Sequence, residues 1–394
     1  MKRAIAGVLL VSMLLVSGCW DRTEINDLAF VSGAAFDLTK DGEYLLSLQI
    51  AIPSSSQGGV GSSDGEKEKF FVLSAVGNNA NEAFEKLQKK SSRRLFPAHR
   101  SVIFIGEALA RHGINDILDV FTHDPRQRLR TYIMVVKGGE GLDILEAKYP
   151  FEQVPIEAIK EMEALSSELA VTLGEFFMAA SSPGISPVMG VIMSEGDSGG
   201  VKSGDKQLVK LAGLAFFKEM KVVGFLDSEE TNGFLWLTDR MKYGRINAII
   251  SEGDVKGNVG MTLNSAHRKI TTEVNGGAPK VRIQLQGVGS LVENNTRLDI
   301  SRPNNLKLVQ HALEQSVERQ VRDVVAKLQK QYKVDSVGFG MDMYQNHYKQ
   351  WKTLQPKWEQ TFPEVKVAVD VQLALTGVGM AGPPLQLKEE EIVK

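Results

Sequence analysis

The stretch from residue 303 to residue 332, PNNLKLVQHALEQSVERQVRDVVAKLQKQY, decides the fold of the last third of this 394-residue chain. Apolar residues recur in it at spacings of three and four, which is the period of an amphipathic helix. The stripe consists of Val309, Leu313, Val317, Val321, Val324 and Leu328. Pro303 suits a first helical turn, and the helix would be about 40 Å long. The stripe is too short for a heptad argument, so we expect it to pack on a sheet of its own domain.

The residues around this helix predict that sheet. After the helix come a turn at residues 338–340, a second helix over 341–354 and a strand over 365–375. Before it, alternation and turn residues predict strands over 209–217, 222–226, 245–250, 260–266, 269–274 and 280–291, with a helix over 229–241. Asn275-Gly276-Gly277 is a strong turn between two of these strands.

The N-terminal half mixes strands and helices in the same way. We expect strands over 28–36, 44–52, 101–105, 131–136 and 188–193, and helices over 79–90, 107–111, 114–121, 141–147 and 156–180. Residues 53–69 and 194–206 are rich in Ser and Gly and should be loops. We place a domain boundary in the second loop, because strands and turns dominate beyond it.

The first eighteen residues have the pattern of a secretory signal. Met1-Lys2-Arg3 is a positive start, and residues 4–16 carry no charge, which is typical of a signal peptide. That apolar run is shorter than the roughly 20 residues that a membrane-spanning helix needs. Residues 16–19 read Val-Ser-Gly-Cys, and small residues before a cysteine resemble a lipobox. We therefore expect cleavage before Cys19 and a diacylglycerol on its thiol.

The composition agrees with a lipid-anchored, exported protein. Cys19 is the only cysteine, so an intramolecular disulfide is excluded, and lipidation gives the lone thiol a role. Two or more acyl chains would hold the chain on a membrane. No later stretch is long and apolar enough to cross it. The net charge of −2 gives no support for nucleic-acid binding.

The fold class predicted from these patterns is α+β, with three mixed sheet-plus-helix domains after a cleaved lipoprotein signal peptide. The expected limits are 1–18 for the signal peptide, 19–197 for an N-terminal α+β domain, 207–298 for a β-rich middle domain and 299–394 for a C-terminal domain with the long helix.

Catalytic patterns are weak. Residues 196–200, Gly-Asp-Ser-Gly-Gly, match the surround of a nucleophilic serine at Ser198, but polar coil follows where the hydrolase elbow needs a helix. No His/Cys spacing of a metal site and no phosphate-binding glycine loop occurs. Trp351 and Trp358 could stack on a ligand, but packing at a core or domain interface is the better interpretation. His99 precedes a buried strand and is interpreted as a hydrogen-bonded cap. We expect no enzyme activity and no cofactor.

Four segments, in order along the chain, resemble the C-subunit lipoproteins of spore germinant receptors, the Ger(x)C family. They are residues 18–22 (GCWDR), 99–107 (HRSVIFIGE), 211–217 (LAGLAFF) and 335–340 (DSVGFG), the last followed by Trp351 and Trp358. The resemblance implies three α+β domains and a non-enzymatic subunit of a nutrient receptor in the inner membrane of bacterial spores.

The resemblance also implies partners, namely two membrane-spanning subunits, A and B. The only residue that it assigns a role is the lipidated Cys19, and the partner-binding surface stays unassigned. Two other functions remain open: a solute-binding lipoprotein of a transporter, and a lipid-anchored hydrolase that uses Ser198. Alternating βα units, which are typical of solute-binding lobes, are not evident in the middle region.

Overall fold

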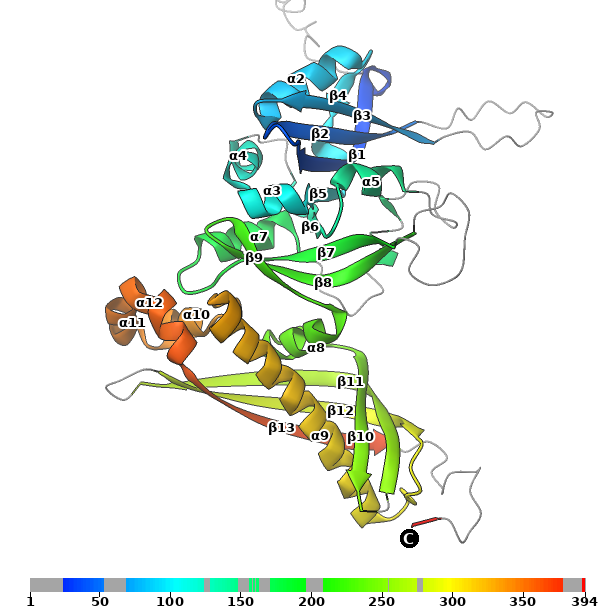
Figure 1. The fold of residues 1–394 in the computed structure, drawn as a ribbon, viewed down its shortest axis with the longest axis vertical. Helices are drawn as coiled ribbons and strands as arrows, with labels where there is room; N and C mark the ends of the chain where they lie inside the picture. Colours follow the sequence, from blue (N-terminus) through cyan, green and yellow to red (C-terminus); the bar gives the residue numbers. More distant parts are fainter. Residues whose placement is uncertain are drawn as a thin grey trace, which may run out of the picture.

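The protein is described here from a computed structural model. The described residues are 24–52, 69–123, 128–147, 171–195, 208–253, 255–274, 279–377 and 392–393, with 156, 157, 159, 161 and 162. They form two sheets that follow one another along the long axis of the molecule (Figure 1). The mixture of strands and helices confirms the α+β fold class.

The first sheet is mixed and has nine strands. Its order is β3-β2-β1-β5-β6-β7-β8-β9, and β4 pairs with the start of β1. The central strands β1, β5, β6 and β7 are parallel neighbours, while β2, β3, β8 and β9 add antiparallel pairs at the two sides. The strands are β1 Leu28–Leu38, β2 Tyr44–Ala51, β3 Phe70–Gly77, β4 Arg94–Phe96, β5 Val102–Gly106, β6 Tyr132–Val136, β7 Val188–Glu195, β8 Leu208–Lys218 and β9 Lys221–Leu226.

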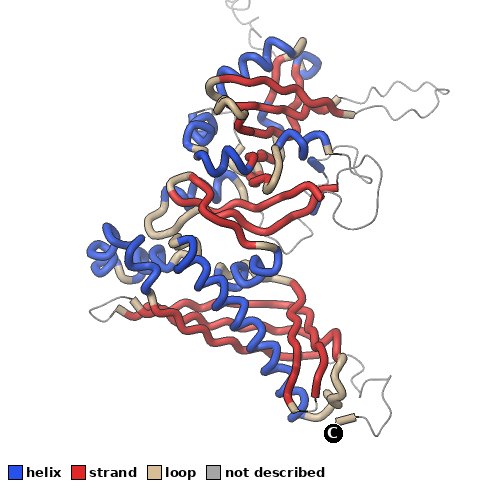
Figure 2. The backbone as a smooth tube through the Cα atoms, viewed as in Figure 1, coloured by secondary structure: helices blue, strands red, loops and turns tan. Residues whose placement is uncertain are grey.

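Helices cover both faces of the first sheet (Figure 2). Buried residues of α2, α3, α4 and α7 share one core with it, whereas α5 packs into a second core on the other face. These helices are α2 Ala80–Lys90, α3 Glu107–His112, α4 Asn115–His123, α5 Gly141–Glu146 and α7 Leu173–Ser181. Asn79 accepts a hydrogen bond from the Glu82 N–H and so caps α2.

The second sheet has four strands in the order β10-β11-β12-β13, antiparallel except for the parallel β12–β13 pair. The strands are β10 Gly244–Glu252, β11 Val255–Glu273, β12 Lys280–Asn294 and β13 Lys366–Gly377. Helix α9, Pro303–Ala326, runs across one face of this sheet (Figure 1) and continues as a π-helical turn, η3, Lys327–Tyr332. All six residues of the predicted stripe are buried, so the predicted packing of the helix on its own sheet is confirmed.

Short helices complete the chain. Between η3 and β13 come α10 Phe339–Asn346, α11 Tyr348–Leu354, η4 Gln355–Lys357, α12 Trp358–Thr361 and η5 Phe362–Glu364. Helix α8, Ser228–Leu237, joins β9 to β10, and Phe234 and Trp236 in it belong to the core that runs from one sheet into the other. Two short 3-10 helices remain: η1, Ile25–Asp27, precedes β1, and η2, Pro97–His99, lies between β4 and β5.

Several elements differ from the sequence prediction. Strands β3 and β4 were not predicted, and β11 is one strand where two were expected, over 260–266 and 269–274. The helix expected over 341–354 is broken at His347, which separates α10 from α11. The helix expected over 156–180 is interrupted: residues 156, 157, 159, 161 and 162 are helical, residues 171–172 are not, and α7 follows. Residues 158, 160 and 163–170 lie outside the described residues.

The predicted domain limits fall between paired elements. Strands β7 and β8, which precede and follow residues 196–207, pair antiparallel in the first sheet. Strands β12 and β13, on the two sides of residue 298, pair in the second sheet. The three-domain division at 197/207 and 298/299 therefore stays a prediction, and the described chain is organised as two sheets.

Candidate functional site at the junction of the two sheets

The sequence-predicted site residue, Cys19, lies outside the described residues, and so does Ser198. The described part of the chain holds no cluster of three His, Cys, Asp or Glu side chains placed to bind a metal ion. None of its helices is both long enough and apolar enough to cross a membrane. The structure does bring together Trp351, Trp358 and residues 335–340, at the place where the two sheets meet.

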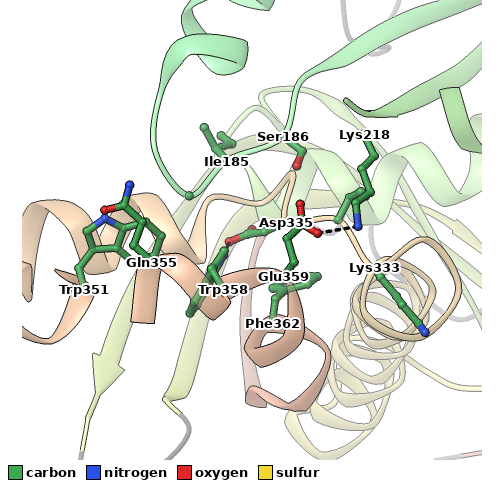
Figure 3. A pocket seen from close by; sticks show the side chains of 12 residues that line it. Ile185, Ser186, Lys218, Lys333, Asp335, Trp351, Gln355, Trp358, Glu359 and Phe362 are labelled. Carbon is green, nitrogen blue, oxygen red and sulfur yellow. Dashed lines mark hydrogen bonds and ion pairs between the residues drawn. The ribbon is translucent and has the colours of Figure 1, made fainter. Parts of the chain in front are cut away.

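We call this place the junction. From the first sheet it comprises the loop at 182–187, Lys218, Gly224 and Phe225; from the second it comprises residues 332–340, Trp351 and residues 355–362. A cavity of about 220 Å³ lies between the two sides. Figure 3 shows Ile185 and Ser186 on one side of it, with Trp351 and Trp358 opposite.

The carboxylate of Asp335 organises the second-sheet side of the junction. Its Oδ1 accepts hydrogen bonds from the backbone N–H groups of Gly338 (2.8 Å) and Phe339 (3.1 Å). Its Oδ2 accepts from the Gly340 N–H (2.7 Å) and from the indole Nε1 of Trp358 (3.1 Å). All four donors are protein groups, so the Asp335 carboxylate has a structural role: its hydrogen bonds hold residues 338–340 close to Trp358 of α12.

Burial and hydrogen bonding oppose each other at Asp335. Burial raises the pKa of this carboxyl to about 6, although the three backbone N–H groups and the Trp358 indole each favour the charged form and lower it. Asp335 is 5% exposed. Its ionisation is therefore coupled to the integrity of the junction, because the charge is held only by groups that come from the surrounding fold.

The two tryptophans pack against each other, as the packing interpretation predicts. Trp351 is 1% exposed and Trp358 is 7% exposed, and their rings meet edge to face with centroids 5.4 Å apart. Trp358 donates to Asp335, whereas the Nε1 of Trp351 is buried and has no partner among the described residues. Both also line the cavity.

Two glycines let the backbones of the two sides approach. Gly184 has φ +73°, and a Cβ on Gly340 would lie 2.7 Å from the Gly184 Cα. This approach permits backbone hydrogen bonds across the junction, from Met341 N to Gly184 O (3.1 Å) and from Ser186 N to Asp335 O (2.7 Å). A side chain at either position would separate the two backbones.

Tyr332 closes the junction on the side of β9, an edge strand of the first sheet. Its hydroxyl donates to Phe225 O (2.6 Å) and accepts from Phe225 N (3.1 Å), which satisfies backbone groups that an edge strand leaves unpaired. Its ring stacks on Phe216 with centroids 5.9 Å apart. The ring also fills the space above Gly224, where an added Cβ would overlap it.

Charged groups lie at the rim of the junction. Lys218 of β8 and Glu359 of α12 form an ion pair of 2.9 Å across the mouth of the cavity (Figure 3). Glu175 of α7 and Arg240 form another, of 3.1 Å. Although burial raises it, hydrogen bonds from Thr172 and the Arg240 charge hold the pKa of Glu175 below its usual value.

A second cavity, of about 340 Å³, lies beside the first and shares Ile185 and Ser186 with it. It is lined by apolar side chains from both sheets and by Arg268, which donates to the Leu237 carbonyl from its guanidinium group. Burial lowers the pKa of Arg268, while Asp239 and Asp342 raise it. Both cavities therefore lie where the two sheets meet.

Sequence reasoning found part of this site. It singled out residues 335–340, Trp351 and Trp358, but not Gly184 or Tyr332, which have no pattern around them. The interpretation of His99 as a hydrogen-bonded cap does not fit. Its imidazole is exposed and packs against Phe30 and Phe96, with centroids 5.5 and 5.7 Å apart, and no hydrogen bond of its side chain is found within the described ranges.

Comparison with known proteins identifies the family. Residues 21–193 match the family described as "Spore germination protein N-terminal domain", and residues 212–379 match "Spore germination B3/ GerAC like, C-terminal". The putative spore germination protein YfkR of Bacillus subtilis (strain 168) is 30% identical over 91% of this chain and 92% of its own. Spore germination protein KC of the same organism is 26% identical over 98% of both chains.

A solved structure supports the fold. The crystal structure of the GerBC protein superposes with a TM-score of 0.57 at 22% identity, covering 90% of this chain and 100% of that one. Both halves of the chain match the same group of proteins, in the same order and over nearly the full length. The chain therefore belongs to the Ger(x)C family of spore germination proteins.

Proposed function

We propose that this chain is the lipid-anchored, non-enzymatic C subunit of a nutrient germinant receptor and that it acts with membrane-spanning A and B subunits. The observation that carries the proposal is the match of both germination-protein domains, residues 21–193 and 212–379, within one chain. Its place in the cell would be the outer face of the inner spore membrane.

The anchor would be diacylglycerol on Cys19. The described fold starts at Glu24, five residues later, so the lipid would be tied to the folded part by a short tether. Acyl labelling in sporulating cells tests this assignment. Cys19→Ala should abolish the label and leave the precursor uncut. The control Ser17→Ala, two residues away, should keep both the label and the cleavage. A Cys19→Ala protein that still carries the acyl label would remove the anchor from the proposal.

A role in assembly agrees with the construction of the junction. The buried carboxylate of Asp335 accepts hydrogen bonds from four protein donors. Such a carboxylate suits a structural role, in which it holds the surrounding chain in place. The junction sets how the two sheets face each other and therefore how any partner meets them.

The receptor role is tested by purification from spore membranes with an affinity tag on this chain. We expect two polytopic membrane proteins to co-purify, and a strain without this chain to lose its response to at least one nutrient. If spores that have no related receptor germinate normally with every nutrient after the deletion, the receptor role is wrong. Tight binding of a small solute by the isolated chain would instead favour a solute-binding lipoprotein.

A further inference from the structure

A run of cations without acids extends from the last turns of α2 to the first residue of β4. Residues 86–94 read KLQKKSSRR, and all five Lys and Arg side chains in it are exposed. Lys86 is paired with Glu82. The other four are Lys89, Lys90, Arg93 and Arg94, for which no ion pair is found in the part of the chain that the structure describes. We call these four residues the basic edge.

The pairing of β4 places the basic edge beside the beginning of the described fold. Arg94 is the register partner of Leu28 in the parallel β1–β4 pair, and η1, Ile25–Asp27, directly precedes Leu28. Glu24 is the fifth residue after Cys19. Whatever their conformation, five residues span at most about 18 Å, so a lipid on Cys19 would keep the basic edge close to a membrane surface.

The surroundings of the basic edge contain both apolar and acidic groups. Ile25 is 74% exposed in η1. Phe30, Phe96 and His99 form an aromatic cluster at the end of β4. Besides Glu82, which pairs with Lys86, the acids around η1 and on α2 are Glu24, Asp27 and Glu85, all of them exposed. Four cations against these three acids leave a local excess of one positive charge.

This local excess runs against the charge of the whole chain, which is −2. An anionic surface would repel such a chain on average, and would attract it only where cations gather. In Figure 1 α2 and β4 lie at one end of the molecule, and β10 to β13 lie at the other. An anionic surface would therefore select one end of the molecule.

We propose that the basic edge binds anionic phospholipid headgroups beside the lipid anchor and so orients the long axis of the protein away from the membrane. The inference rests on the proposed anchor at Cys19 and deepens it. Stable membrane attachment commonly combines a lipid with a polybasic surface, and each Lys or Arg near an anionic leaflet strengthens binding by about fivefold.

The test uses a chain that begins at residue 20, which carries no cysteine and no lipid. All described helices and strands lie between Ile25 and Gly377, so this chain keeps each of them. Sedimentation with phosphatidylglycerol-containing vesicles, with pure phosphatidylcholine vesicles as reference, measures binding. We expect binding only to the anionic vesicles, and its loss in high salt, because salt screens exposed charges.

The decisive variant is Lys89→Gln, Lys90→Gln, Arg93→Gln and Arg94→Gln together. The matched control replaces two lysines and two arginines that are exposed on the second sheet: Arg245→Gln, Lys256→Gln, Arg282→Gln and Lys366→Gln. Both quadruple variants change the net charge equally. The basic-edge variant should bind at least about tenfold more weakly, and the control should bind as the parent chain does. Equal unfolding midpoints in urea confirm that both are folded.

Three results would overturn the proposal: no binding of the parent chain to anionic vesicles, equal binding of the basic-edge variant and the parent, or an equal loss in the control. Equal binding would point to a protein partner as the occupant of the basic edge. Because the test chain has no lipid, its outcome is independent of acylation at Cys19, which is measured separately in cells.

Discussion

Replacing Trp358 by Phe removes one hydrogen bond from the Asp335 carboxylate and changes no charge. The indole N–H donates to Oδ2 at 3.1 Å, and both side chains are buried. A hydrogen bond to a charged group contributes about 1.5–3 kcal/mol to the free energy of unfolding. The smaller ring also loses packing, so this second loss has to be measured by itself.

Trp351 offers the matched control for that packing loss. Its ring packs against Trp358 at 5.4 Å and is 1% exposed, but its buried Nε1 has no partner among the described residues. Trp351→Phe therefore removes the same atoms without removing a hydrogen bond. We expect Trp358→Phe to lower the free energy of unfolding by about 1.5–3 kcal/mol more than Trp351→Phe does.

Urea unfolding of the chain from residue 20, followed by far-ultraviolet circular dichroism, measures this difference without depending on tryptophan fluorescence. A second readout distinguishes the hydrogen bond from packing. Since the indole favours the charged carboxylate, the loss in Trp358→Phe should be larger at pH 7.5 than at pH 5, and the loss in Trp351→Phe should be independent of pH. Equal losses in the two variants would refute the role assigned to the Trp358–Asp335 hydrogen bond.

Two further predictions concern the buried groups. Burial raises the pKa of both Asp37 and Asp335 from 3.8 to about 6. Between pH 3.8 and about 6 the folded state therefore binds more protons than the unfolded state. The stability that each group contributes below pH 4 is lost as the pH rises through 6. Urea unfolding at pH 5 and pH 7.5 should show a decrease of about 1 kcal/mol for each group, and Asp37→Asn should halve it; stability that is constant or rises over this range would contradict the assignment. Gly224→Ala should destabilise the protein by about 1–3 kcal/mol because the new methyl group overlaps the Tyr332 ring. The control Gly139→Ala, where the nearest atom to the new methyl group would be 3.7 Å away, should change the unfolding midpoint little. Equal effects of the two substitutions would argue against the contact between Gly224 and Tyr332.

The sequence predicts those elements whose pattern is local. The stripe of α9 and η3 repeats over six buried residues, so the helix and its buried face follow from the spacing alone. Strand β3, FFVLSAVG, was missed because its sequence does not alternate between apolar and polar residues. In the structure its burial alternates only at its end, where Ala75 and Gly77 are buried. Strand β4 has three residues and depends on β1. Strand β11 continues through Arg268, where polar residues predicted a break, because Leu237 and Asp239 accept hydrogen bonds from it.

The junction could be predicted only in part, since its contacts join residues far apart in the chain. Asp335 and Trp358 are 23 residues apart, and Tyr332 and Phe225 are 107 apart. Nothing near Gly184 predicts that its backbone meets that of Gly340. The family resemblance identified residues 335–340 as important, but the physical reason, a carboxylate held by four donors, required the structure.

The length of β11 has a mechanical consequence. Its 19 residues extend for about 60 Å at the usual rise of a strand. Residues 255–263 pair with β10, residues 259–273 pair with β12, and near the end of the strand Thr272 donates to Asp342 of α10 at 2.6 Å. One strand, with register shifts at Gly260/Met261 and Leu263/Ser265, thus connects the far hairpin to the helices around Asp335. The far hairpin is therefore joined to the junction by a single strand, and the close contact between Gly184 and Gly340 fixes the junction to the first sheet.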